Sequence, residues 1–246
     1  KALEAGKHVL CEKPFTANAE EASIVAEAAR ASGLVVMEAF HWRYHPVAAR
    51  VLSLIESGAV GSVRRVDASF RFPLLARGDI RWQLDLAGGA FMDAGCYAVH
   101  MIRTFAGAGE PTVVSATATE RSPGVDASLQ AELSFGDGAV QGTASASMWS
   151  VPRIVATVTG DAGSIKVLNP LAPHVWHRLT VSGKSGKSTE KVRGRATYTH
   201  QLEAFVAAVT SGEPFPTGVD DAIANMRVID AAYTAAGLEP RQGSVA

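Results

Sequence analysis

Cysteine is scarce in this sequence: the 246 residues include only Cys11 and Cys96, which lie far apart. Two isolated thiols build neither a disulfide framework nor a zinc cluster and are typical of a reducing compartment, so we expect a cytoplasmic protein. Runs of 18 or more apolar residues are also lacking. The first residues do not have the charged, then apolar, then small layout of a signal peptide. We therefore expect no membrane partner.

An excess of charge of either sign is missing as well. Lys and Arg total 23, Asp and Glu total 24, and the formal net charge is −1. The basic residues are scattered except for one cluster at 184–195, which is rich in Gly and Ser and is typical of an exposed hairpin or loop. A nucleic-acid-binding surface needs a concentrated basic patch, so we expect no nucleic-acid partner.

The sequence also lacks the Gly-x-Gly-x-x-Gly fingerprint of dinucleotide-binding proteins, because the glycine pairs at 107–109 and 136–138 have no third glycine. The two Gly-Lys-Ser triplets at 183–188 lack the upstream glycine of a phosphate-binding loop and indicate turns. Residues 1–7 resemble the end of a helix with a glycine stop. We expect that a longer protein supplies the glycine loop before Lys1, and that the chain alone is inactive and binds cofactor poorly.

A strand-helix-strand pattern opens the chain. Apolar runs at 8–11 and 34–37 predict buried strands, and Thr16 or Asn18 is suited to cap the helix between them, which Gly33 would end. Two strands joined by a helix in this length form a parallel crossover unit. Residues 1–38 therefore indicate an α/β remnant of a Rossmann domain, in which ligands bind beyond the carboxyl ends of the strands.

The rest of the chain, residues 39–246, predicts an α+β domain with a large, mainly antiparallel sheet of about six strands and helices on one face. Most of the strand-like segments lie within 112–192, with a hairpin at 136–138. The predicted helices cover residues 46–57, 90–105, 199–211 and 219–236, and a further strand covers 63–72.

The helix predicted at 90–105 is apolar enough to be buried, yet it carries three titratable groups. Asp93 and Tyr97 are one turn apart, and His100 falls on the same side one turn further on. Buried polar groups need partners. The helix face is therefore either a satisfied internal hydrogen-bond network or an acid/base site that faces a cavity. The residues alone favour neither alternative.

Polar side chains also follow the two predicted parallel strands. Glu12 and Lys13 come at the end of the first, and the cluster 41–45 follows the second. The cluster is either a domain hinge covered by aromatic side chains or a pocket wall, and its position favours the pocket wall. His174 and His177 have no nearby Cys or acidic pair, so we expect no metal site.

Three motifs in a fixed order resemble the glucose-fructose oxidoreductase, inositol dehydrogenase and MocA (Gfo/Idh/MocA) family, in its branch with aldose and dihydrodiol dehydrogenases. They are AGKHVLCEKP at 5–14, EAFHWRYHP at 38–46 and GGAFMDAGCY at 88–97. The resemblance covers nearly the whole chain. It implies an NAD- or NADP-dependent dehydrogenase that acts on a hydroxyl-bearing carbon of a sugar or cyclic polyol, and a homo-oligomer formed through the open sheet face of a substrate-binding and dimerisation domain.

The resemblance also implies residue roles. Lys13 would bind the substrate hydroxyl and the nicotinamide ribose, which Glu12 would border, and Tyr97 would be the proton shuttle. Asp93 would orient the substrate, and Trp42 would line its pocket. Many relatives carry His where Tyr97 stands.

His100 is accordingly a second candidate for proton relay and substrate binding. Because an ammonium favours a nearby phenolate, we expect Lys13 to lower the pKa of Tyr97. Two other functions fit this fold. They are a non-catalytic sugar- or nucleotide-sensing protein and a dimerisation scaffold, but neither needs a paired base and ammonium.

Overall fold

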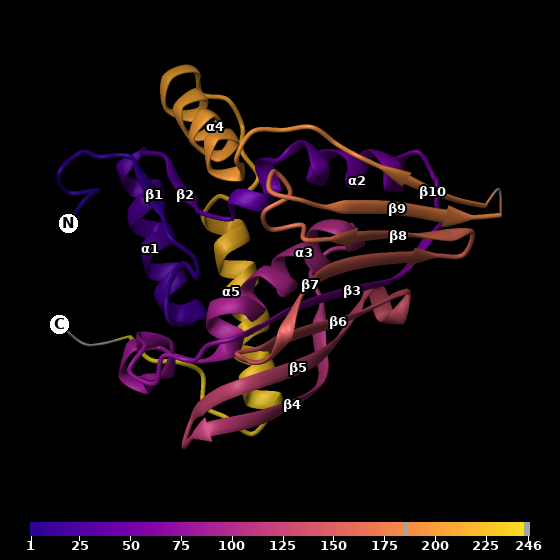
Figure 1. Cartoon of the computed structure of the whole chain (residues 1–246). Helices are drawn as coiled ribbons and strands as arrows, with labels where there is room; N and C mark the ends of the chain where they lie inside the picture. The colour runs from indigo at the N-terminus through magenta and orange to yellow at the C-terminus, as the bar shows by residue number, and fades with distance from the viewer. Residues whose placement is uncertain (185, 244–246) are drawn as a thin grey trace.

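The protein is described by a computed structural model that covers residues 1–184 and 186–243. A small β-α-β unit lies beside a much larger sheet that carries its own helices (Figure 1). The α/β start and the large, mainly antiparallel sheet that the sequence predicts are both present.

The β-α-β unit contains two parallel strands and the helix between them: β1 (Val9–Cys11), α1 (Ala19–Ser32) and β2 (Val36–Glu38). Asn18 caps α1, because its side-chain oxygen accepts a hydrogen bond from the main-chain N–H of Glu21 at 2.9 Å. Gly33 ends the helix in the left-handed region, with φ at 66°. Capping chemistry visible in the sequence therefore sets both ends of this helix.

Eight strands form the large sheet, in the order β10-β9-β8-β7-β3-β6-β5-β4. Neighbouring strands are antiparallel except for β3 and β6, which are parallel. The strands are β3 (Val63–Pro73), β4 (Thr112–Ser122), β5 (Val125–Phe135), β6 (Val140–Ser147), β7 (Trp149–Gly160), β8 (Gly163–Leu168), β9 (Arg178–Gly183) and β10 (Gly186–Glu190).

The sheet is larger than the sequence predicted. Strand β3 precedes the predicted sheet region in the sequence, yet it lies in the sheet between β6 and β7. Strands β9 and β10 lie at the edge of the sheet opposite β4. Alternation of apolar and polar residues marks a strand but does not identify its partners, which long-range contacts select. The predicted hairpin at 136–138 is confirmed, with Asp137 at φ 53°. Residue 185, in the predicted turn at 183–188, lies outside the described residues.

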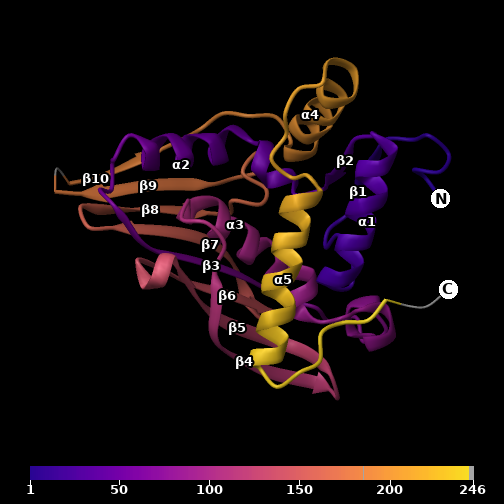
Figure 2. The same ribbon diagram turned by 180° about the vertical axis from the view of Figure 1, so that it is seen from behind.

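Three further helices match the predicted ones within two residues: α2 (Pro46–Glu56), α4 (Thr197–Ser211) and α5 (Val219–Ala235). The helix predicted at 90–105 is divided, because Phe91–Gly95 is π-helical and the α-helix α3 (Cys96–Ala106) begins only after it. Figure 2 shows α2, α3 and α5 on the same side of the sheet, and α1 packs against α5. Among the described residues, no helix combines the length and apolar character that crossing a membrane requires.

The core lies between the sheet and α3. Along β3 the buried side chains are Val66, Ala68 and Phe70, and the alternate positions Arg65 and Asp67 face the other side. A fully buried side chain of this kind stabilises the fold by about 1.5–3 kcal/mol. Because α3 is buried against the sheet, any buried polar group on it needs a hydrogen-bond partner inside the protein.

Candidate active site

Lys13 lies just beyond β1, and its ammonium contacts Asp93, which is 80 residues further along the chain, shortly before α3. Lys13 Nζ donates to the main-chain oxygen of Asp93 at 2.6 Å and to Asp93 Oδ1 at 3.0 Å. Burial opposes the charged form, but the influence of Cys96 and Asp93 outweighs it and raises the pKa of Lys13. Lys13 is therefore an ammonium at neutral pH that Asp93 holds in place, and an ammonium has three protons to donate.

A second cation on Asp93 was not foreseen in the sequence. Arg81 belongs to the short helical turn η2 (Ile80–Trp82), and its Nε lies 3.0 Å from Asp93 Oδ2. The charge of Asp93 accordingly raises the pKa of Arg81. In the sequence the obvious partner of Arg81 is Asp79, two residues away. Only the fold of the segment between η2 and α3 brings Arg81 to Asp93.

These side chains line a cleft of about 400 Å³. Its wall combines charged groups with a stretch of main chain that carries no bulky side chains, at Gly88 and Gly89. The lining includes Glu12, Lys13, Pro14, Thr16, Arg81, Met92 and Asp93. The structure thus brings Glu12, Lys13 and Asp93 together at the carboxyl end of β1, where α/β sheets bind their ligands. Ammonium, guanidinium and carboxylate groups suit a ligand that carries several hydroxyls.

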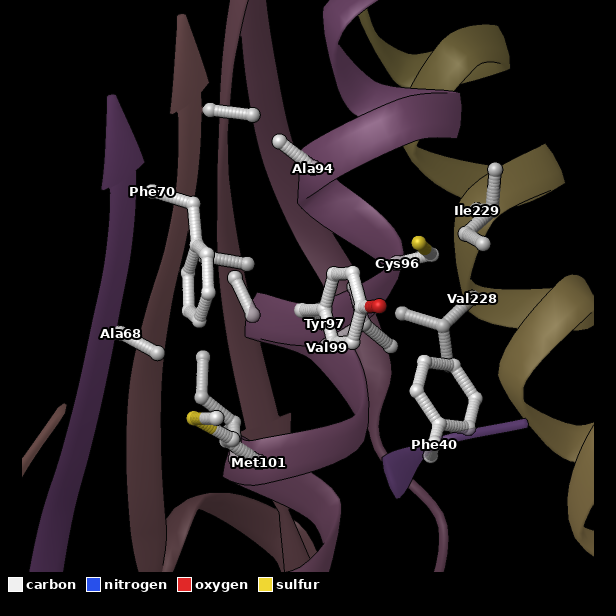
Figure 3. Packing of buried hydrophobic residues seen from close by; sticks show 14 of the residues in the cluster. Phe40, Ala68, Phe70, Ala94, Cys96, Tyr97, Val99, Met101, Val228 and Ile229 are labelled. Atoms are coloured by element: carbon white, nitrogen blue, oxygen red, sulfur yellow. The ribbon is translucent and has the colours of Figure 1, made fainter. Parts of the chain in front are cut away.

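Tyr97 lies behind Lys13, whose Nζ is 4.9 Å from the centroid of the tyrosine ring. Figure 3 shows the ring between Phe70 of the sheet and Phe40; the ring centroids are 5.6 and 5.4 Å away. The phenolic oxygen lies 3.3 Å from His41 Nε2. The segment 41–45 was predicted as a hinge or a pocket wall, and its first residue contacts Tyr97.

The expected effect of Lys13 on Tyr97 is wrong. Burial, reinforced by neighbouring acidic groups, raises the pKa of Tyr97 well above its ordinary value. The reason is geometric: the Lys13 ammonium lies over the ring and binds Asp93, while the phenolic oxygen points to a neutral imidazole. The resting form of Tyr97 is therefore the neutral phenol, which can give a proton but is a poor base.

Trp42 and His100 contact each other and do not line the cleft. Trp42 Nε1 donates to His100 Nδ1 at 3.1 Å, and His100 Nε2 lies 3.0 Å from Asp221 Oδ2. Both side chains are almost fully buried, and the His100 ring stacks on Phe40 at 4.0 Å. Burial lowers the pKa of His100, so the ring is neutral and accepts from Trp42, and Asp221 lies beside its other nitrogen.

A π-helical turn contains Asp93 and precedes the other two titratable groups. Residues Phe91–Gly95 form this turn, η4, and α3 begins directly after it. A π turn holds more residues than an α turn, so the positions after it are rotated relative to a regular helix. The three groups have different polar partners: Asp93 contacts Lys13, Tyr97 contacts His41, and His100 lies beside Asp221. For His100 the structure has the internal network that the sequence left as one alternative.

Glu38 is a buried carboxylic acid close to this site. It ends β2 and is 1% exposed, and its carboxyl oxygens have no hydrogen-bond partner within residues 1–184 and 186–243. Burial, reinforced by the charge of Asp221, raises the pKa of Glu38 to about 8. Glu38 is therefore largely protonated at neutral pH.

We expect Glu38 to make stability fall with rising pH. Its folded-state pKa exceeds its unfolded one, so the folded state binds more protons between about pH 4.5 and 8, and stability is lost across that interval. The loss is about 1 kcal/mol per pH unit. Denaturant unfolding from pH 7 to 8, a window above the ordinary pKa of His of about 6.5, should give this slope for the wild type. Glu38→Gln should flatten it; equal slopes for the two proteins would contradict the prediction.

The family comparisons agree with this geometry. Residues 1–40 match the protein-family model described as "Oxidoreductase family, NAD-binding Rossmann fold". Residues 48–166 match the protein-family model of the GFO/IDH/MocA C-terminal domain.

Individual relatives are dehydrogenases and a ketoreductase. The chain is 38% identical to D-xylose 1-dehydrogenase (NADP(+)) 2 of Haloferax volcanii, over 96% of the chain and 72% of the relative. It is 34% identical to trans-1,2-dihydrobenzene-1,2-diol dehydrogenase of Macaca fascicularis, over 68% of the chain and 50% of that protein. The crystal structure of KijD10, a 3-ketoreductase from Actinomadura kijaniata, in complex with NADP and TDP-benzene, aligns with a TM-score of 0.87. This alignment has 29% identity and covers 95% of the chain and 72% of KijD10.

Proposed function

The chain belongs to the Gfo/Idh/MocA oxidoreductase family, and from this premise we propose that it transfers a hydride between NAD or NADP and a hydroxyl-bearing carbon of a sugar or cyclic polyol. The observation that carries the proposal is the placement of Lys13 between Asp93 and Tyr97 at the end of a parallel strand. A protein that only senses a sugar has no need of a proton donor beside an ammonium.

The cleft at Lys13 suits the nicotinamide end of the cofactor. Lys13 and Glu12 present a donor and an acceptor for ribose hydroxyls, and Gly88 and Gly89 form part of the wall of the cleft. The bound nicotinamide supplies or accepts the hydride. The family models and the KijD10 complex support a cofactor of the NAD or NADP type.

Each site residue then has one task in the reduction of a carbonyl group. Lys13, held by Asp93, donates a hydrogen bond to the substrate oxygen and stabilises the negative charge that grows there. Tyr97 gives its phenolic proton to the same oxygen, so one O–H bond breaks on Tyr97 and one forms on the product. Oxidation reverses these steps. Asp93 keeps Lys13 charged, and Arg81 holds the second oxygen of Asp93.

Turnover with a panel of sugars tests the proposal. We expect the protein, in its full natural length, to reduce NADP or NAD in the presence of D-xylose, other aldoses, a cyclic polyol or a trans-dihydrodiol, and not in their absence. Ligand binding is measured in parallel by calorimetry. Binding of a sugar without turnover of any member would favour the sensing protein and contradict the proposal.

We also infer a homo-oligomer through the open sheet face and a cytoplasmic location. The uncovered face of the sheet carries polar side chains such as Arg65, which forms ion pairs with both Asp67 and Glu132. Analytical ultracentrifugation of the wild type tests the oligomer, and a monomer at micromolar concentration would contradict it.

A further inference from the structure

His41 connects Tyr97 to a buried hydroxyl on another part of the chain. His41 Nε2 lies 3.3 Å from the Tyr97 oxygen, and His41 Nδ1 lies 2.8 Å from Thr197 Oγ1. The imidazole is 5% exposed and Thr197 is fully buried. Residues from η1 (His41–Tyr44), α3 and α4 thus form one chain of three polar groups inside the protein.

The protonation state of the His41 ring gives this series of hydrogen bonds one direction. Burial, reinforced by the charges of Lys13 and His174, lowers the pKa of His41 to about 4, so the ring is neutral at neutral pH. A neutral imidazole has one N–H and one acceptor nitrogen. Of the two hydroxyls that flank it, one therefore donates to the ring and the other accepts from it.

Resting on the proposed function, we propose that His41 is the positioning residue of Tyr97: Thr197 donates to His41 Nδ1, and His41 Nε2–H donates to the phenolic oxygen. This direction leaves the phenolic proton free to point at the substrate. When the substrate oxygen takes that proton, the Nε2–H bond stabilises the phenolate that remains. No proton leaves His41 in this step, and the Tyr97 phenolate regains its proton from solvent water before the next reduction. The opposite direction would turn the phenolic proton toward His41 and away from the substrate.

Within residues 1–184 and 186–243, His41 is the group that lies within hydrogen-bond distance of the phenolic oxygen. Lys13 is held by Asp93 over the ring face, and Tyr198 of α4 stacks on His41 with ring centroids 4.2 Å apart. His174 acts on His41 through its charge. A charge-assisted hydrogen bond is about twice as strong as a neutral one, so a donor at this place matters most when the phenolate forms.

Substitutions of His41 test the proposal through kcat. We expect His41→Leu to lower kcat about tenfold, the low end of the effect of a hydrogen bond to a charged group, with KM little changed. His41→Gln, which keeps an N–H donor, should recover part of the loss. In alcohol oxidation, the pH at which kcat rises should be higher for His41→Leu than for the wild type. His200→Leu, at a histidine that binds the Arg195 N–H, is the matched control and should keep wild-type turnover.

A double-mutant comparison separates this role from a structural one. If His41 acts through the phenol, His41→Leu should cost almost nothing further in a Tyr97→Phe protein. An unchanged cost in that protein would overturn the proposal. If Tyr97→Phe itself turns over at the wild-type rate, the proposed function fails. If Tyr97→Phe is inactive and His41→Leu matches the wild type, only the role of His41 fails.

The tautomer of His41 gives a readout that needs no turnover. Nitrogen NMR of the histidine rings in the wild-type protein should show the Nε2–H tautomer for His41 at neutral pH. Thr197→Val, which removes the hydroxyl and keeps the shape, should abolish this preference. A wild-type ring with Nδ1–H would mean that His41 accepts the phenolic proton, and it would overturn the proposal.

Discussion

Replacing Tyr97 by Phe should lower kcat by about a hundredfold or more, because the reaction then lacks the group that exchanges a proton with the substrate oxygen. KM should change little, since Lys13 and Asp93 keep their contacts. The fold should tolerate the change: the aromatic ring packs between Phe70 and Phe40 in either protein. Steady-state kinetics in both directions measure the effect.

The hydroxyl of Tyr97 bonds to His41, so a control for lost structure is needed. The unfolding free energy of Tyr97→Phe should stay within about 1.5 kcal/mol of the wild-type value, the range of one hydrogen bond. A matched control is Tyr198→Phe, which removes an exposed hydroxyl from the other side of His41 and should keep wild-type kcat. A Tyr97→Phe protein that turns over like the wild type would remove Tyr97 from the role of proton shuttle.

Local chemistry in the sequence was sufficient for the elements that depend on neighbours along the chain. Asn18 and Gly33 delimit α1 through hydrogen bonds and backbone angles that involve residues three or fewer positions away. Apolar runs of strand length predicted β1 and β2 for the same reason, since a short buried strand has few other interpretations between turn signals. The parallel order of the two strands then follows from the helix between them.

The site was predictable only in part. Lys13 follows a strand and Asp93 opens a buried helix, and the resemblance to a known family joins them across 80 residues. Arg81 has no such signal, because its nearest acidic residue in sequence is Asp79 and the contact with Asp93 depends on how a loop folds. The π turn at Phe91–Gly95 was equally hidden: its sequence suits an ordinary helix, and tertiary packing selects the wider turn.

The upward shift of the Tyr97 pKa shows that the presence of a charged neighbour does not by itself determine how a pKa changes. Proximity of a lysine predicts a lower pKa, but the outcome depends on whether the ammonium faces the oxygen or the ring and on how much water reaches the phenol. In the structure both factors favour the neutral form. The partner of the phenolic oxygen is a histidine from a motif whose pattern indicated only a hinge or a pocket wall.

A buried ion pair supports the glycine turn before α3, and its partners come from distant parts of the chain. Arg241 donates to the Gly88 oxygen at 2.8 Å and to Asp126 Oδ1 at 2.9 Å. Asp126 also accepts from the Phe91 N–H at 2.8 Å and the Tyr233 hydroxyl at 2.9 Å. Arg241 and Asp126 are at most 1% exposed. Breaking such a pair leaves a buried charge without compensation.

Replacing Arg241 by Met should therefore cost about 3–5 kcal/mol of unfolding free energy at pH 7. Burial already raises the pKa of Asp126, and the positive charge of Arg241 opposes that rise. Without Arg241 the folded-state pKa moves further above the unfolded one, and the variant loses stability as pH rises between them. Denaturant unfolding at pH 5 and pH 7 should give a smaller deficit at pH 5.

The double variant Arg241→Met, Asp126→Asn tests whether the uncompensated charge causes this loss. It removes both charges and keeps a side-chain oxygen for the Phe91 N–H, so we expect it to recover about half or more of the stability lost in Arg241→Met, as replacing both partners of a buried pair costs far less than removing one. If the double variant is as unstable as the single one, lost packing on the Tyr233 ring, which Arg241 covers at 3.9 Å, is the cause instead. Arg241 also binds the Gly88 oxygen at the wall of the cleft, where Asp93 meets Lys13. The same variants therefore test whether the geometry of the cleft depends on this ion pair.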